Sequence, residues 1–507
     1  MRKALAVKSS FVSLFAKIVT MIFSLIIARY FMRYLGVENS GINGVFSNVI
    51  GFLQLAELGI GTAIVYALYE PLVEGNDREV GILMRFYRKV YRYIGGIILV
   101  FGIILCPFVT FFIHDATYSK TYLIITFLLQ IISSASTYFL SYKRNLLYAD
   151  QKQYIAAAID ALVNIISAII RLYVMVYTGS YIIYLGVQVV QNIVSNLIIS
   201  LWCDRQYPFL KNLPTDKYDK MPQLIDNVKN LMVGKIGGWV YKSTDNLIIS
   251  RFTTVILVGL LANYYTLSIT LKTLINAMVE PIQPMIGHMV CEDRERSEVY
   301  DFFLSYTFIR YCIAIMATVG FIEMANPIVS IWLGPEYVVN QSIVILMAID
   351  IFISVSHGPT VEFIATLGLF KNDKNLSIAG AVINLSSSLI LVQFMGAEGV
   401  LLGTVIAQCF YWSIRAVVVF RQYFHMGWVK YIFKCVKYII STVASVIVLN
   451  YVFYSSYFAT DSLLVVIIRG IITAAVSGMV IIIFNAFTDE FRYLLNMIYN
   501  SLRKKYR

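Results

Sequence analysis

The stretch KNLMVGKIGGWVYKSTDNLIISRFTTVI, residues 229–256, is long enough to cross a bilayer as a helix, yet it contains lysines where lipid excludes charge. On a helix that advances ~100° per residue, Lys235, Trp239, Lys242 and Asn246 fall on one stripe about 60° wide. A charge at the bilayer centre costs about 2.5–3.5 kcal/mol even on the most lenient scale. The stripe therefore predicts a helix that faces a water-filled cavity or buried partners. Cations beside an aromatic ring suit an anionic, sugar-bearing ligand, which points to a transporter.

The rest of the chain has the composition of a membrane protein. Of its 507 residues, 59% are hydrophobic and only 14% are charged. Repeated apolar runs of about 20 residues predict an all-α polytopic membrane protein with about 14 transmembrane helices. The predicted spans are residues 10–33, 42–68, 93–114, 121–142, 154–176, 181–203, 229–251, 257–285, 305–325, 342–367, 376–395, 398–420, 435–457 and 463–486.

The distribution of basic residues predicts the topology. The net charge of +12 comes from 41 Lys and Arg residues against 29 Asp and Glu residues. With both termini in the cytoplasm, about 29 of the cations lie in inner loops and tails, and about three lie at outer ends. This asymmetry predicts cytoplasmic N- and C-termini. It also accounts for the basic charge without nucleic acid, because the inner leaflet of a bacterial membrane is anionic.

A polar stretch divides the predicted spans into two groups. Residues 204–228 form a predicted cytoplasmic linker between an N-lobe, residues 1–203 with spans one to six, and a C-lobe, residues 229–420 with spans seven to twelve. Residues 421–507 contain spans thirteen and fourteen and a basic C-terminal tail. Three residues recur at an offset of about 220, which predicts that the two six-helix lobes form a parallel pseudo-repeat. Coincidence would explain three identities equally well.

Five cations form a predicted site for an anion. Lys17 and Arg29 lie on the first predicted span, Lys235 and Lys242 on the seventh, and Lys272 on the eighth. Lys17 lies about eight residues past the inner boundary, which is deep for an amine that must reach water along the lipid face. We expect the five side chains to line a cationic cavity, with structural ion pairs as the alternative.

A carboxylate lies in the middle of the second predicted span. Glu57 shares one helical face with Ser47, Gln54 and Gly61. A lone carboxylate at this depth is protonated or paired with a cation. We expect it to serve in ion coupling or charge pairing, with a purely structural ion pair as the alternative. The other acids given this role are Asp245 and Glu280.

Other charged residues in the spans are expected to form structural pairs or interface anchors. They are Asp160, Arg171, Arg310, Asp350, His357, Glu362, Arg415 and Arg469. The sequence lacks the G-x-x-x-x-G-K-S/T loop of ATP-hydrolysing proteins, and it lacks the HExxH and G-x-S-x-G motifs of hydrolases. We therefore expect a protein that is not an enzyme and that needs neither a cofactor nor a metal.

Six short motifs lie along the first eight predicted helices. They are YLGVE at 34–38, GINGVFS at 41–47, LAELGIGTA at 55–63, YALYEPL at 66–72, KRNLLYADQ at 143–151 and TDNLIIS at 244–250. In these motifs the chain resembles the Wzx-type polysaccharide flippases of the MATE-like multidrug/oligosaccharidyl-lipid/polysaccharide exporter superfamily. The last six predicted helices match that family in pattern only.

The resemblance implies that the protein moves an undecaprenyl-diphosphate-linked oligosaccharide from the inner to the outer leaflet of a bacterial cell membrane. Such a repeat unit would serve capsule, O-antigen or other cell-surface polysaccharide assembly. The resemblance also implies two lobes that alternate access around a cationic cavity. We expect the five cations to hold the diphosphate, and Trp239 and Tyr241 to stack on sugar rings. The expected partners are this lipid-linked oligosaccharide, membrane lipids and polysaccharide polymerase machinery.

Two other functions fit the sequence less well. A cation-coupled drug or small-molecule exporter of the same superfamily would have a cavity dominated by carboxylates, whereas spans one, seven and eight hold more cations than acids. A membrane polysaccharide polymerase or ligase would need a large outward loop. The longest predicted outward loop, residues 325–341, is too short for a catalytic domain.

Overall fold

Helices make up the described part of the chain. The computed structural model describes residues 2–57, 60–113, 117–150, 152–214, 244–279, 282–291, 295–367, 369–453 and 462–492, with the single residues 115, 216, 218, 222 and 225. These residues form helices and connections and contain no strand. They belong to two compact units, Met1–Gly259 (unit 1) and Leu260–Arg507 (unit 2). The predicted all-α fold is confirmed, and the predicted lobe boundaries stay predictions.

Twelve helical segments among the described residues have the length and hydropathy to cross a bilayer. They are Val19–Leu53, Asp77–Phe112, Lys120–Phe139, Gln153–Thr178, Tyr181–Gln206, Val255–Asn276, Arg296–Trp332, Gln341–Thr366, Asn375–Met395, Ala397–Phe424, Val429–Phe453 and Leu463–Asn485. The protein is therefore a multi-pass membrane protein, as predicted. Of the predicted span 229–251, only residues 244–251 lie within the described part.

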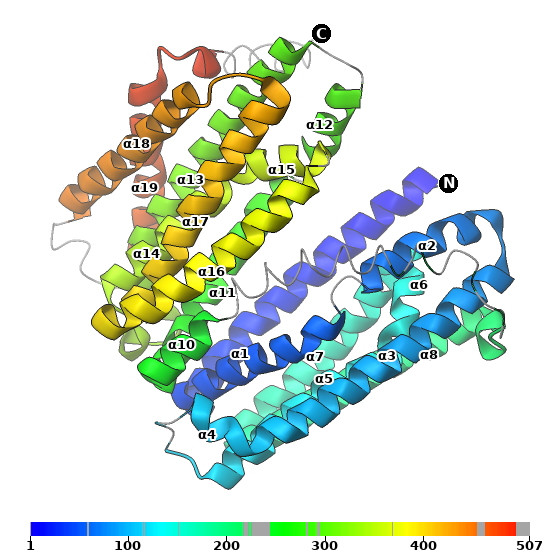
Figure 1. Ribbon diagram of the computed structural model, residues 1–507. Coiled ribbons are helices and arrows are strands. Elements are labelled where there is room, and N and C mark those ends of the chain that lie inside the picture. Colours follow the sequence, from blue (N-terminus) through cyan, green and yellow to red (C-terminus); the bar gives the residue numbers. More distant parts are fainter. Residues whose placement is uncertain are drawn as a thin grey trace. The chain divides into compact units, whose positions relative to one another are not determined.

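Unit 1 contains the first helices of the chain. They are α1 (Arg2–Leu53), α2 (Ile60–Glu74), α3 (Asp77–Leu105), α4 (Val109–Phe112), α5 (Lys120–Leu140), α6 (Arg144–Ala149), α7 (Gln153–Thr178), α8 (Tyr181–Gln206), α10 (Asp245–Phe252) and the start of α11 (Val255–Val279). Helix α5 packs against α3 and α8, and α7 packs against α1 and α8 (Figure 1). Phe31 of α1 makes edge contacts with Tyr181 and Tyr184 of α8 at centroid distances of 5.6 and 5.2 Å. Such aromatic contacts add specific attraction to the apolar packing.

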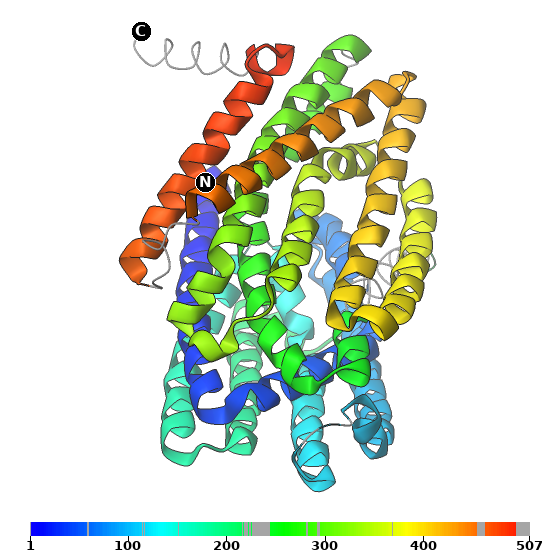
Figure 2. The same ribbon diagram turned by 90° about the vertical axis from the view of Figure 1, so that its left-hand side faces the viewer.

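Helix α1 bends at Gly36. This residue has φ +83° and ψ +163°, a conformation open essentially to glycine alone. The helix changes direction there (Figure 2). Beyond the bend, Gly41 brings α1 against the start of α11, because a Cβ on Gly41 would lie 1.9 Å from the carbonyl oxygen of Val255. Close backbone approach at small residues is typical of packed membrane helices.

The predicted span 42–68 is interrupted in the structure. Helix α1 ends at Leu53, a single 3₁₀ turn covers Gln54–Glu57, and α2 begins at Ile60. Hydropathy does not reveal this break, since the residues on both sides are apolar. Non-helical backbone at membrane depth is tolerated where it is buried in protein or lines a water-filled cavity. The break between α1 and α2 is therefore a position where a polar site can form.

Unit 2 contains the rest of the helices. They are most of α11, then α12 (Ile282–Cys291), α13 (Arg296–Trp332), α14 (Gln341–Ser356), α15 (Gly358–Thr366), α16 (Phe370–Met395), α17 (Ala397–Val419), α18 (Val429–Phe453) and α19 (Leu463–Asn485). Helices α16 and α17 run side by side (Figures 1 and 2), with the amide of Asn384 donating to the hydroxyl of Thr404 at 2.9 Å. Phe303 of α13, Phe363 of α15 and Phe420, in the π-helical turn after α17, form an aromatic core.

Candidate functional site

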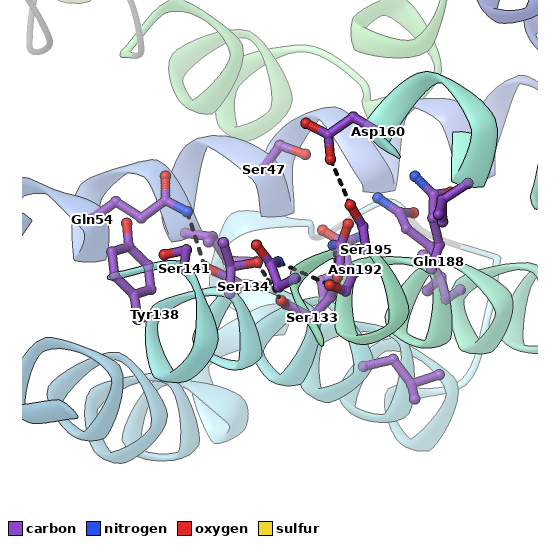
Figure 3. A pocket seen from close by; sticks show the side chains of 18 of the residues that line it. Ser47, Gln54, Ser133, Ser134, Tyr138, Ser141, Asp160, Gln188, Asn192 and Ser195 are labelled. Carbon is purple, nitrogen blue, oxygen red and sulfur yellow. Dashed lines mark hydrogen bonds between the residues drawn. The ribbon is translucent and has the colours of Figure 1, made fainter. Parts of the chain in front are cut away.

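A polar cavity of about 810 Å³ lies inside unit 1. Its lining comes from α1, the 3₁₀ turn that follows it, α3, α5, α6, α7 and α8. Figure 3 shows ten of the lining side chains labelled, almost all of them uncharged and polar. Polar groups on membrane helices are costly when they face lipid, so they face the bundle interior or water. The cavity is therefore the polar interior of unit 1.

Two helices contribute most of this lining. The lining polar residues of α5 and its C-terminal turn are Gln130, Ser133, Ser134, Thr137, Tyr138 and Ser141. Those in the middle of α8 are Gln188, Gln191, Asn192, Ser195 and Asn196. Their spacing of three and four residues places each set on one face of its helix. Because the two helices pack against each other, the two polar faces enclose a common space.

Amide and hydroxyl groups bond to one another across the cavity. Gln54 Nε2 donates to Ser134 Oγ at 2.9 Å, and Asn192 Nδ2 donates to Ser133 Oγ at 2.7 Å (Figure 3). These bonds join the turn after α1 to α5, and α5 to α8. They hold the lining in place without placing charge in the cavity.

Gln191 has spare hydrogen-bonding capacity at the wall of the cavity. Its Nε2 donates to Asn164 Oδ1 at 2.5 Å. Its Oε1 is buried and has no hydrogen-bond partner among the described residues. A buried acceptor without a donor is destabilising, and a bound water or ligand that donates to it would remove that penalty.

Glu57 lies at the break between α1 and α2 and lines the cavity. Its two carboxylate oxygens accept hydrogen bonds from tyrosine hydroxyls, one from Tyr91 of α3 and one from Tyr138 of α5 at 2.8 Å. Hydroxyl donors compensate a buried carboxylate in part, because bonds to charged groups are stronger than neutral ones. The described partners of Glu57 are therefore neutral donors from two neighbouring helices.

Arg144 and Asp160 form an ion pair in the same wall. Arg144 Nη1 lies 2.5 Å from Asp160 Oδ2, and Nη2 lies 3.0 Å from Oδ1, which makes the contact bidentate. Asp160 Oδ1 also accepts from Ser195 at 2.5 Å, and Asn196 accepts from Arg144 at 3.2 Å. The described lining thus holds three charged side chains, the carboxylates of Glu57 and Asp160 and the guanidinium of Arg144, and has one net negative charge.

Of the residues predicted for the site, Glu57 lines this cavity, together with Ser47 and Gln54 from the same predicted face. The uncharged polar faces of α5 and α8 were not predicted, because the prediction of the site relied on charged residues and amide side chains are uncharged. The regular spacing of Gln, Asn, Ser and Thr in residues 130–141 and 188–196 was the available signal.

Most of the predicted cations and aromatic residues cannot be compared with the structure. Lys235, Trp239, Tyr241, Lys242 and Glu280 lie outside the described residues. Lys17 belongs to α1, but its side chain is also outside the described part. The predicted cationic cavity therefore remains a prediction.

Three other predicted residues are described, and none of them is among the lining residues of the polar cavity. Arg29 is an exposed residue of α1, and Asp245 is buried at the first position of α10. In unit 2, the amine of Lys272 on α11 donates to the carboxylate of Asp350 on α14. Asp350 also accepts from the amide of Gln408. Lys272 thus pairs with a neighbouring helix through one of the three N–H donors of its ammonium group.

A second buried network of charged residues lies in unit 2. Arg310 of α13 is 2% exposed, and its Nε donates to the carbonyl oxygen of Val355 at 2.9 Å. Arg310 Nη1 lies 3.9 Å from Glu362 Oε1. The helix is interrupted between α14 and α15 beside this guanidinium, where a Cβ on Gly358 would lie 1.8 Å from Arg310 Nη2. The structure pairs Arg310 with Glu362, as expected for a structural ion pair.

The described part of unit 1 thus consists of membrane-length helices around a polar interior. The model of the family described as "Polysaccharide biosynthesis protein" matches residues 6–290. Since this is more than half of the chain, the protein belongs to that family. No curated protein matches the sequence at a significant level.

Solved structures share the fold at low sequence identity. A structure of the lipid II flippase MurJ in an inward closed conformation has a TM-score of 0.69 and 15% identity, covering 96% of this chain and 100% of that one. A MATE family multidrug transporter of the MOP superfamily, in an inward-facing conformation, has a TM-score of 0.58 and 12% identity, covering 80% and 96%. The MATE transporter DinF-BH has a TM-score of 0.58 and 13% identity, covering 82% and 95%. The chain thus has the fold of flippases and exporters of the MOP superfamily.

Proposed function

We propose that this protein is a flippase that moves an undecaprenyl-diphosphate-linked oligosaccharide from the inner to the outer leaflet, for the assembly of a cell-surface polysaccharide. The observation that carries the proposal is the cavity of about 810 Å³, lined by amides and hydroxyls within membrane-spanning helices. The family match and the fold shared with a lipid II flippase support it. The protein acts as a translocator and not as an enzyme.

The cavity addresses the main energetic barrier to this movement. Each hydroxyl taken from water into hydrocarbon without a partner costs ~4–8 kcal/mol, so a glycan with about ten hydroxyls faces tens of kcal/mol. Side chains that both donate and accept hydrogen bonds replace the lost water as the glycan passes. The lipid tail stays in the bilayer throughout.

The charged headgroup needs cations, and the sequence offers five. We propose that Lys17, Arg29, Lys235, Lys242 and Lys272 hold the diphosphate by charge-assisted hydrogen bonds. Trp239 and Tyr241 stack on sugar rings in this proposal, and Glu57, Asp245 and Glu280 serve in ion coupling or charge pairing. An outgoing anion gains ~2.3 kcal/mol per charge per 100 mV when the cytoplasm is negative, so the membrane potential favours export.

A second candidate is a cation-coupled exporter of small molecules. The observation that favours it is the presence of two carboxylates, Glu57 and Asp160, in the cavity of unit 1. Asp160 is already paired with Arg144, and Glu57 accepts from two tyrosines. These contacts make the carboxylates less available to a cationic drug than a solvated acid would be.

A transport assay on purified protein in vesicles separates the two functions. A fluorescent undecaprenyl-diphosphate oligosaccharide is placed in the bilayer, and a membrane-impermeant quencher reports its leaflet. Wild-type protein is expected to speed the exchange. The paired change Lys235→Ala and Lys242→Ala is expected to slow it at least about tenfold, since each lost charge-assisted bond is worth about 1.5–3 kcal/mol.

The matched control is Lys211→Ala, which removes an exposed lysine after α8. It should leave the exchange rate unchanged. Wild-type vesicles that export a cationic dye but leave the lipid-linked oligosaccharide in its leaflet would favour the second candidate. Normal flipping by the Lys235 and Lys242 variant would remove the cationic role.

A further inference from the structure

The chemistry of the unit 1 cavity narrows the class of glycan that it accepts. Of its described lining residues, Glu57, Asp160 and Arg144 are charged, and most of the others carry amides or hydroxyls. The guanidinium of Arg144 is held by both oxygens of Asp160, so it offers no uncompensated positive charge to a ligand. The described lining therefore lacks the cations that a carboxylate or phosphate would need.

Amide side chains match a particular kind of ligand. Each carries two donors and an acceptor, and a sugar hydroxyl with an acetamido group offers two donors and two acceptors to pair with them. The buried Oε1 of Gln191 lacks a donor and would accept from such a group. A volume of about 810 Å³ lies within the range of about 300–1,000 Å³ that holds a drug-sized ligand, so the cavity has room for a few sugar rings.

We infer that the unit 1 cavity binds uncharged sugars rich in hydroxyl and acetamido groups, and that it disfavours glycans that carry a carboxylate. This inference rests on the proposed function and adds to it the substrate class of one site. The cations proposed above for the diphosphate are not among the described lining residues of this cavity. The two tyrosine hydroxyls that donate to Glu57 favour its ionised form, so the described lining has one net negative charge, which repels the carboxylate of a uronic acid.

The test compares two fluorescent undecaprenyl-diphosphate trisaccharides in vesicles that contain the full-length protein. One carries three N-acetylated neutral sugars, and the other has a hexuronic acid at its end. Wild-type protein is expected to move the neutral donor roughly tenfold faster, as repulsion by one partly screened charge would give. Glu57→Gln removes the net charge and is expected to shrink this ratio to about twofold or less.

Two matched controls accompany these variants. Glu38→Gln removes a carboxylate of α1 that bonds to Thr117 and does not line the cavity, so the ratio should stay at the wild-type value. Gln191→Leu is expected to slow the neutral donor about fivefold, which is of the order of one lost hydrogen bond. Gln206→Leu, at the exposed end of α8, should leave the rate unchanged.

The outcomes separate the inference from the proposed function. Equal rates for the two donors, or faster movement of the acidic one, would overturn the inference and leave the flippase standing. A folded wild-type protein that moves neither donor would overturn both. A preference for the neutral donor that is lost in Glu57→Gln but kept in Glu38→Gln supports the inference.

Discussion

The ion pair between Arg144 and Asp160 allows a quantitative test of how the wall of the cavity is held. The contact is bidentate, at 2.5 and 3.0 Å, and the two side chains are 21% and 29% exposed. Two unit charges about 4 Å apart attract by about 4 kcal/mol at an effective dielectric constant of 20. Because both side chains are partly exposed, solvent screens part of this attraction, so Arg144→Met is expected to lower the free energy of unfolding by about 2–3 kcal/mol.

This loss is measured as a fall in Tm of the purified protein in detergent. For a unit of this size about 1 kcal/mol corresponds to roughly 2–4 °C, so Tm should fall by roughly 5–10 °C. Asp160→Leu alone should also lower Tm. The double variant should fall by clearly less than the sum, because removing both partners leaves no uncompensated buried charge.

Arg171→Met is the matched control for the loss of an arginine in unit 1. The described contacts of Arg171 are weak: hydrogen bonds of 3.4 Å to the Ser167 carbonyl oxygen and the Tyr184 hydroxyl, and a cation–π contact 5.5 Å from the centroid of the Tyr184 ring. Its removal should therefore change Tm by no more than about 2 °C. If Arg144→Met left Tm within about 1 °C of wild type, or if the two single effects added fully, the reasoning about this pair would be refuted.

Two further changes test the packing of unit 1. Gly41→Leu is expected to prevent folding, because a Cβ at 41 would lie 1.9 Å from a backbone carbonyl oxygen. A Cβ at Gly96 would meet nothing within 4 Å, so Gly96→Leu should give monodisperse protein on size exclusion. A monodisperse Gly41→Leu would contradict this reasoning. Lys143→Met removes a buried amine that bonds to Ser200 and to both oxygens of Asp204, and it should lower Tm by the equivalent of about 2 kcal/mol. The control Arg205→Met, at the exposed end of α8, should leave Tm unchanged. Equal Tm values for the two variants would show that the buried contact is unimportant.

The sequence predicted the regular helices well, because apolar run length and turn residues determine them. The predicted span 181–203 corresponds to α8, Tyr181–Gln206, which begins after Gly179 and Ser180. Gly179 ends α7 in the left-handed conformation, and the Ser180 side chain caps α8. Both signals are local, so they can be read without a structure.

The interruption of the second predicted span could not be predicted from such local signals. The turn at Gln54–Glu57 is held by contacts from other helices, namely Ser134 and Tyr138 of α5 and Tyr91 of α3. These contacts span 34 to 81 residues along the chain. Local hydropathy carries no information about them.

The candidate site was predicted in part. The face with Ser47, Gln54 and Glu57 was recognised because a mid-span carboxylate is costly in lipid. The opposing faces of α5 and α8 have no charge, and their amides are spread among apolar residues. Only the packing of the two helices against each other shows that these residues share one space.

The guanidinium of Arg310 packs against Gly358 and limits which residues positions 310 and 358 can accept. A larger residue at 358 would need the volume that the Arg310 side chain fills. Replacement of Arg310 by a small residue would instead leave a void beside the carboxylate of Glu362 and free the Val355 carbonyl oxygen from its donor. Mutations that are harmful singly at 310 and 358 can therefore compensate one another, and the tolerance of one position depends on the residue at the other.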